Sequence, residues 1–423
     1  MDGQYLISAP WIMPRPGTFI ADGAVLVANQ RIVRLGQAGE ISGSFPNAAR
    51  IHQEDCLLMP GLINAHCHLE LTALSSLCPR PGTVDFIDWI LSVITAKKKA
   101  PEKLFKDGLA AGQQLLLESG TTCVGDYHSP QWFQTDDAPR NQIRAVHFLE
   151  IISREESLEQ DRQPELLESC LVHESTQDSL VQVGIAPHSP YTVSLPLLGQ
   201  LITMAEKHRL PLSMHLGEST AESRFFRDGR GPIATKLYPF VGWQDFPPPA
   251  YGKDSIDTLL QENLLRCLSA VHLGTARSDQ LKEFARLAVK PILCPRSNHT
   301  LGNPLPDLEA MLNSGLAPAL GTDSLASVGS LSLWDEMRFL HQNFPDLPAE
   351  IILTMATVNG AAALGLQDVG QLAPECQADM IAVQLRTPRQ IPSLDELIKH
   401  TDIQDIRMVM VGGKIEKSAT GIP

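Results

Sequence analysis

The feature that most constrains the fold is the alternation of short apolar runs with longer helical stretches between residues 57 and 340. The runs are rich in Val, Ile and Leu, and helical patterns such as 195–209 and 278–288 separate them. This alternation is typical of α/β proteins with a parallel sheet. The predicted strands are residues 57–66, 121–127, 144–151, 181–188, 211–218, 268–274, 290–298 and 316–324.

Eight parallel strands separated by helices can close into a (β/α)8 barrel, which commonly takes about 250 residues. The span from 57 to 340 fits that size. The competing arrangement is a doubly wound open sheet, whose usual mark is a Gly-rich first turn. The first turn here reads HCHLELT and contains no glycine. We therefore predict the barrel.

The two ends of the chain have a different pattern. GAVLVANQRIVRLG near the N-terminus and ADMIAVQL and IRMVMVGGKIE near the C-terminus read as strands and turns. We predict a small β-sandwich-like domain formed by residues 1–56 plus 370–423, beside a barrel of residues 57–369. The alternative is that each end packs separately.

Composition excludes several classes of protein. Lys plus Arg number 34 and Asp plus Glu number 48, a formal net charge of −14, and an acidic chain repels nucleic-acid phosphates. No window holds the roughly 18 uninterrupted apolar residues that a membrane span needs. The N-terminus has neither the basic start nor the apolar core of a signal peptide. The eight cysteines are scattered without a CxxC pair, which indicates reduced thiols. We expect a cytoplasmic protein without nucleic-acid or membrane partners.

Metal-ligand side chains stand where predicted strands end. His66 and His68 end the first strand, and because side chains alternate along a strand they can face one ion together. His215 ends the fifth strand, His272 the sixth and Asp323 the eighth. A lone strand histidine is more often structural, but the convergence of this set at one barrel face indicates a site. Three imidazoles and a carboxylate suit Zn²⁺, or a similar ion such as Fe²⁺, with one coordination position open.

These segments also resemble a known family. PGLINAHCHLE, HLGE, VHLG and LGTDS, in that order, are similar to the metal-dependent amidohydrolase superfamily across essentially the whole chain. The resemblance implies that His66, His68, His215 and Asp323 ligate the metal. It implies that His272 contacts the metal-bound water or the tetrahedral intermediate.

The fourth strand bears on the number of ions. Binuclear members of the superfamily carry a bridging carboxylated lysine there, whereas this sequence has His188. We therefore expect one divalent ion per subunit. Glu150 at the end of the third strand could serve as a bridging carboxylate, or it could be structural.

The resemblance extends to the deaminase branch. PHSPYT (187–192), CPRSNHTLGN (294–303) and LGTDSLAS (320–327) are similar to aminodeoxyfutalosine, S-adenosylhomocysteine and methylthioadenosine deaminases. In that branch the Glu of HxxE, here Glu218, protonates a ring nitrogen and passes a proton to the leaving group. Asp323 would accept the proton of the attacking water. Glu218, His272 and Asp323 are thus the predicted catalytic residues of an aminopurine nucleoside deaminase that releases ammonia.

Five residues are candidates for substrate contact. His188 would meet a ribose hydroxyl or the purine edge, and Arg296 and Asn298 would lie at the mouth of the seventh strand. Phe86 and Trp89, in the apolar helix VDFIDWILSVI, could stack on a purine, although core packing is the commoner use of such residues. His128 at the end of the second strand could line the cavity or be a spectator.

Several alternatives stay open at this stage. The same machinery could act on guanine, a cytosine-like ring or a triazine, or a binuclear variant could hydrolyse a cyclic amide. A barrel that has lost its activity is a third reading, but every expected ligand is present. The Pro-rich loop 246–253 could form a lid or a contact between subunits, so a homodimer stays open.

Overall fold

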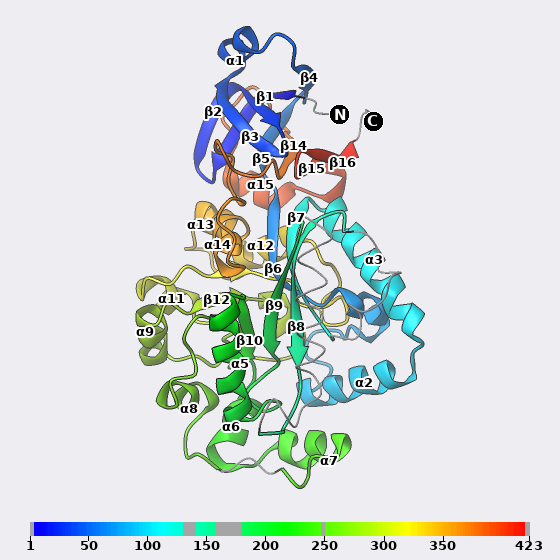
Figure 1. Ribbon diagram of the computed structural model, residues 1–423, viewed down its shortest axis with the longest axis vertical. Helices are drawn as coiled ribbons and strands as arrows, with labels where there is room; N and C mark the ends of the chain where they lie inside the picture. The colour runs from blue at the N-terminus through cyan, green and yellow to red at the C-terminus, as the bar shows by residue number, and fades with distance from the viewer. Residues whose placement is uncertain (1–3, 130–140, 157–179, 247–249, 419–423) are drawn as a thin grey trace.

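The computed structural model describes residues 4–129, 141–156, 180–246 and 250–418. Residue Cys170 and residues 247–249 of the predicted Pro-rich loop lie outside the described residues. Two eight-stranded sheets organise the described part of the chain. Figure 1 shows them one above the other, with the sheet that holds both ends of the chain at the top.

The lower sheet is the predicted parallel barrel. Its strands follow one another in chain order, and each pairs in parallel with the next. They are β6 (Leu62–Cys67), β7 (Thr121–His128), β8 (Arg144–Ile151), β9 (Val181–Pro187), β10 (Leu212–Leu216), β11 (Leu268–His272), β12 (Lys290–Leu293) and β13 (Ala319–Leu320). A parallel bridge between Cys67 and Asp323 brings the last strand against the first. The predicted (β/α)8 barrel is confirmed.

The connections between barrel strands are mostly helical, and in Figure 1 α5, α8 and α9 lie on one flank and α2 and α3 on the other. The helices up to the sixth strand are α2 (Phe86–Lys99), α3 (Glu102–Glu118), α5 (Leu195–His208), α6 (Thr220–Asp228), α7 (Tyr238–Val241) and α8 (Ser255–Gln261), with the shorter η1 (Leu69–Leu77) and η3 (Ile233–Leu237). The later helices are α9 (Ser278–Arg286), α10 (Pro295–Thr300), α11 (Leu308–Asn313), α12 (Leu333–Asn343), α13 (Ala349–Met355) and α14 (Val358–Ala363). None of the helices in the described ranges has the length and apolar character to cross a membrane.

Both ends of the chain build the upper sheet, as predicted. Its order is β16-β15-β14-β5-β1-β2-β3, and β4 pairs with β1. The strands are β1 (Tyr5–Arg15), β2 (Thr18–Ala28), β3 (Arg31–Gln37), β4 (Ala49–His52), β5 (Cys56–Pro60), β14 (Met380–Gln384), β15 (Ile406–Val411) and β16 (Lys414–Ser418). Helices α1 (Ala38–Ser44), α15 (Leu394–His400) and η4 (Ile403–Asp405) complete it.

The strand predicted over 57–66 is in fact two strands in different sheets. β5 pairs with β1 and β14 of the upper sheet, and β6 opens the barrel. Gly61 separates them, where a Cβ would meet the Thr122 side chain at 2.0 Å, so only glycine allows this close approach. The predicted boundary between residues 56 and 57 therefore falls inside the upper sheet, and the chain enters the barrel after Gly61.

The seventh predicted strand is also shorter than expected. It ends at Leu293, and α10 begins at Pro295. Proline suits the first turn of a helix because its φ is preset and its missing N–H is not needed there. Residues 296–298 are therefore helical, which changes where their side chains point.

Candidate active site

A cavity of about 180 Å³ opens at the carboxyl ends of the barrel strands. The polar part of its lining comes from strand ends and includes His68, His188, His215, Glu218, His272 and Asp323. His66 is outside this lining and fully buried, with its Nε2 3.7 Å from Oδ1 of Asp323. The fold therefore brings all the predicted metal ligands and all three predicted catalytic residues to one place.

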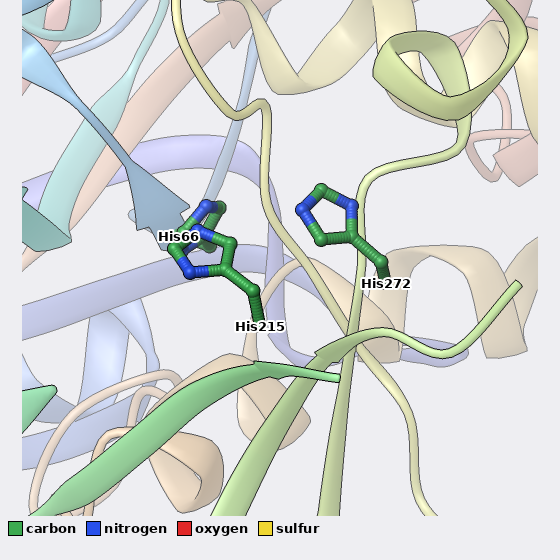
Figure 2. A group of neighbouring side chains, drawn as sticks. All are labelled: His66, His215 and His272. Carbon is green, nitrogen blue, oxygen red and sulfur yellow. The ribbon is translucent and has the colours of Figure 1, made fainter. Parts of the chain in front are cut away.

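Three imidazoles from three strands face a common space. Figure 2 shows His66 from β6, His215 from β10 and His272 from β11 with their rings turned toward one another. One ring nitrogen of each lies within 4.8 Å of the others, and the same is true of a ligand atom from each of His66, His68 and Asp323. Gly321 permits the approach of the last strand, since a Cβ there would lie 2.6 Å from the Cβ of His66.

Backbone carbonyls fix which nitrogen of His68 and His215 faces the site. His68 Nδ1 lies 3.0 Å from the carbonyl oxygen of Tyr127, and His215 Nδ1 lies 2.8 Å from that of His188. Each Nδ1 therefore carries a proton and donates it, which leaves the lone pair on Nε2. The two Nε2 atoms are 3.3 Å apart. Two facing lone pairs at this distance repel each other unless a cation lies between them.

The Asp323 carboxylate completes the set. Its Oδ1 lies 3.7 Å from Nε2 of both His66 and His68, and its Oδ2 accepts hydrogen bonds from Ser297 Oγ at 2.5 Å and Ser327 Oγ at 2.9 Å. Burial acts to raise the pKa of Asp323, but hydrogen bonding and the nearby imidazoles outweigh it and hold the pKa below its usual value. The carboxylate is therefore ionised.

The donor set fits a divalent metal ion. Neither ring nitrogen of His66 has a hydrogen-bond partner, although the side chain is fully buried, and such a group costs free energy unless something binds it. Burial lowers the pKa of both His66 and His215, so the imidazoles are neutral. Neutral imidazoles with one carboxylate are the ligands that Zn²⁺ and Fe²⁺ take.

Asn298 lies behind His272 instead of at the mouth of the cavity. Its Nδ2 donates to the carbonyl oxygen of Pro304 at 2.8 Å, so its Oδ1 faces His272 Nδ1 at 2.9 Å and accepts that proton. The Nε2 lone pair of His272 then points toward Glu218, whose Oε1 is 3.7 Å away. Asn298 therefore contacts His272 and not the cavity where a substrate was expected, because α10 directs its side-chain amide toward the end of β11.

Arg296 also differs from expectation. Its guanidinium lies outside the cavity lining, where it donates to the carbonyl oxygen of Ser330 at 3.2 Å and faces Glu336 at 3.6 Å. The helical turn that begins at Pro295 directs it there. His188, Phe86 and Trp89 do line the cavity, and burial lowers the pKa of His188 to about 3.

Glu218 faces the cavity from the loop after β10 and is 6% exposed. Burial, together with the charges of Asp323 and Glu222, raises its pKa well above the usual value. Asn303 Nδ2 donates to its Oε1 at 3.3 Å. A protonated carboxyl group beside a metal-type site can act as a proton donor.

Glu222 was missed by the sequence reasoning. It is fully buried, and its carboxylate accepts the N–H of Gly217 at 2.9 Å and of Glu218 at 3.3 Å. It thereby holds the loop that carries Glu218. The spacing Ser219-x-x-Glu222 is the pattern of a helix capping box, and Ser219 does cap α6; that pattern could have drawn attention to it.

Glu150 and His128, whose roles the sequence left open, lie in different places relative to the cavity. Glu150 lines the cavity, with Oε1 buried and without a hydrogen bond, and burial raises its pKa. Glu150 also lies near two of the histidines, since one ligand atom of Glu150, one of His68 and one of His215 are within 4.8 Å of one another. His128 does not line the cavity and lies beside His147 instead.

The fold and the site define a (β/α)8-barrel protein with a candidate metal centre at the carboxyl ends of its strands. The chain belongs to the amidohydrolase family, whose profile matches residues 57–415. The resemblance drawn from the four motifs is thereby confirmed.

Individual relatives cover almost the whole chain. A 5-methylthioadenosine/S-adenosylhomocysteine deaminase of Nitratidesulfovibrio vulgaris is 27% identical over 94% of this chain and 88% of its own. An aminodeoxyfutalosine deaminase of Nitratiruptor sp. is 29% identical over 93% of this chain and 94% of its own. The structure of Helicobacter pylori aminofutalosine deaminase in complex with methylthio-coformycin matches with a TM-score of 0.81 at 23% identity, over 97% of this chain and 99% of that one. The structure of a zinc-bound adenosine deaminase from Xanthomonas campestris matches with a TM-score of 0.81 at 24% identity, over 100% of this chain and 94% of that one.

Proposed function

We propose that this protein is a hydrolytic deaminase of an aminopurine nucleoside derivative and holds one divalent metal ion in its active site. The observation that carries the proposal is the position of Glu218, a buried carboxyl group of raised pKa that faces the same cavity as the histidine and Asp323 cluster. The relatives named as deaminases of adenosine-like compounds support the substrate class.

His66, His68, His215 and Asp323 would hold the ion, with Zn²⁺ favoured and Fe²⁺ as the alternative. A divalent ion of this kind lowers the pKa of a bound water from 15.7 to about 7 and so supplies a nucleophile at neutral pH. His272 would accept a hydrogen bond from the attacking water through its Nε2 lone pair, because Asn298 holds the proton of the ring at Nδ1. The serines that hold Asp323 Oδ2 leave Oδ1 facing the histidines.

The proton steps fall to Glu218 and Asp323. Glu218 gives its proton to the ring nitrogen beside the carbon that water attacks, which prevents negative charge from building on the ring. Asp323 accepts a proton from the attacking water. Asp323 then gives this proton to the exocyclic amino group, and the C–N bond breaks so that ammonia leaves. The new hydroxyl group becomes a carbonyl as it passes its proton to Glu218, which restores the starting state of both carboxyl groups. Such general acid–base catalysis contributes about 10²- to 10⁴-fold.

The wall of the cavity suits a purine with an apolar substituent. Phe86 and Trp89 lie at one side with ring centroids 6.3 Å apart, and Tyr191 and Trp243 also line it. We assign the base or its substituent to this wall, and His188 and Glu150 to polar atoms of the substrate.

The test is ammonia release by the metal-loaded enzyme from a panel of substrates. We expect release from one or more of adenosine, methylthioadenosine, S-adenosylhomocysteine and aminodeoxyfutalosine. Ammonia release only from guanine or cytosine would show that the substrate is a heterocycle other than an aminopurine nucleoside. Chloride or alkylamine release from triazines without any ammonia would contradict deamination altogether.

A further inference from the structure

One short segment contacts all three of the proposed catalytic residues. It runs from Ser297 in α10 to Asn303, three residues after that helix ends, and reads SNHTLGN. The catalytic residues themselves come from three other places in the barrel: Glu218 follows β10, His272 ends β11 and Asp323 follows β13. Because the segment meets all three, it can fix how they face the cavity.

Two of these contacts determine which atom of Asp323 and of His272 is left for the reaction. Ser297 Oγ donates to Asp323 Oδ2 at 2.5 Å, so Oδ1 is the oxygen that faces the histidines. Asn298 Oδ1 accepts the Nδ1 proton of His272 at 2.9 Å, so the lone pair of that ring is on Nε2. Each catalytic residue therefore presents one acceptor atom to the attacking water.

The third contact concerns the two oxygens of Glu218. Asn303 Nδ2 donates to Glu218 Oε1 at 3.3 Å. A side-chain amide nitrogen carries two donors and no acceptor, so Oε1 is the accepting oxygen of the carboxyl group and the acid proton is on Oε2. His272 Nε2 does not draw the proton to Oε1, because it lies 3.7 Å from that oxygen, beyond hydrogen-bonding distance.

Buried contacts hold this segment at both ends. At its start, Glu336 Oε2 accepts the N–H of Arg296 at 3.2 Å, and Glu336 is fully buried. At its end, the N–H of Asn303 donates to the carbonyl oxygen of Asn298 at 2.8 Å, and Asn298 Nδ2 donates to that of Pro304 at 2.8 Å. The positions of the three side chains are therefore set by the protein itself.

We propose that the segment 297–303 is the positioning element of this active site and that Asn303 is the positioning residue of its general acid. Its hydrogen bond to Oε1 keeps the proton of Glu218 on Oε2. From there the proton passes to the ring nitrogen of the substrate, and the O–H bond breaks as the N–H bond forms. The proposal rests on the deaminase function proposed above, because it assigns an atom to one of the proton steps.

The first experiment replaces Asn303 and follows ammonia release by the metal-loaded enzyme. Asn303→Asp keeps the shape of the side chain but puts an acceptor opposite Glu218 Oε1, which draws the acid proton to that oxygen and away from the substrate. We expect kcat to fall by about 10²-fold in this variant. In Asn303→Ala, which only removes the hydrogen bond, kcat should fall by about 10-fold.

The division between kcat and KM identifies a positioning role. KM should change by less than about twofold in both variants, because the lost interaction acts in the transition state, and metal content should stay at the wild-type value. Asn313→Asp makes the same chemical change at an exposed position at the end of α11 and should leave kcat unaltered. An unchanged kcat in both Asn303 variants, or a loss that appears in KM alone, would overturn the proposal.

The second experiment needs no substrate. The infrared spectrum of the full-length, metal-loaded protein at neutral pH should contain a carboxyl C=O stretching band that Glu218→Gln removes. Loss of the hydrogen bond to Oε1 should move this band to higher frequency in Asn303→Ala, and Asn313→Asp should not move it. The absence of such a band, or an equal frequency in wild type and Asn303→Ala, would overturn the proposal.

The two experiments separate this proposal from the function on which it rests. A wild-type enzyme that released no ammonia from any substrate of the panel would contradict the deaminase function. The infrared comparison would still decide whether Asn303 holds the carboxyl group of Glu218.

Discussion

At the residue scale, the site depends on which nitrogen each histidine presents. The carbonyl oxygens of Tyr127 and His188 take the Nδ1 protons of His68 and His215, so both Nε2 atoms face the centre. The side-chain oxygen of Asn298 likewise accepts the Nδ1 proton of His272, which leaves Nε2 of that ring facing the site. The backbone of His272 and of Asp323 has positive φ, at 75° and 62°. Such conformations cost free energy in residues other than glycine and persist where function requires them.

The role of Glu218 gives the first prediction at this scale. Glu218→Gln keeps the shape of the side chain but removes its transferable proton, so we expect kcat to fall by about 10²- to 10⁴-fold. The metal content should stay at the wild-type value, because Glu218 is not among the proposed ligands. The measurements are steady-state ammonia release and elemental analysis of the same sample.

His215→Ala provides the comparison for that variant. It removes a proposed ligand, so activity and the active-site ion should be lost together. If the Glu218→Gln enzyme turned over at the normal rate, Glu218 could not be the residue that transfers the proton.

At the element scale, one face of α2 forms a wall of the cavity. Phe86, Trp89, Ile90, Val93 and Ile94 line it at the three- and four-residue spacing of a helix face. Asp85 caps the helix by accepting the N–H of Ile87 at 3.0 Å. Trp89 Nε1 donates to the carbonyl oxygen of Ala326 at 3.0 Å, which ties the helix to the loop that follows Asp323. The apolar periodicity was visible in the sequence, but the cavity beside it was not.

This wall predicts the effect of Trp89→Ala. Stacking of a base on an aromatic side chain contributes about 1–3 kcal/mol, so we expect kcat/KM for the nucleoside to fall by about 10- to 100-fold, mainly through KM. Metal content should not change. Ser92→Ala, at an exposed position of the same helix, is the control and should leave KM unaltered. An unchanged KM in Trp89→Ala would place the base elsewhere in the cavity.

At the scale of the whole molecule, a buried ion pair joins the barrel to the upper sheet. Arg144 at the start of β8 donates to both carboxylate oxygens of Asp379, at 2.9 and 3.2 Å. Asp379 also accepts the N–H of Gly412 at 2.7 Å. Arg144 is 8% exposed and Asp379 is 2% exposed. Because residues 144 and 379 are far apart in the chain, this contact depends on both sheets being folded.

We therefore predict that Arg144→Ala lowers the free energy of unfolding by about 3–5 kcal/mol, since it leaves a buried carboxylate without its partner. The measurement is the midpoint of urea unfolding. Arg266→Ala is the matched control, because it breaks an exposed ion pair. The side chain of Arg266 is 41% exposed and that of its partner Glu206 is 38% exposed. Exposed pairs contribute less than about 1 kcal/mol, so equal losses in the two variants would contradict a special role for the buried pair.

The sequence by itself determined the barrel, the strand ends that carry His66, His68, His215, His272 and Asp323, and the use of both chain ends in one sheet. These features follow from local periodicity and from the rule that parallel strands end at one face. The tertiary structure alone decided that Thr122 lies against the backbone of Gly61, where β5 leaves the barrel, and that Arg296 and Asn298 meet Ser330 and His272 instead of the cavity. Each of these depends on which residues another segment places nearby, and no local pattern encodes that.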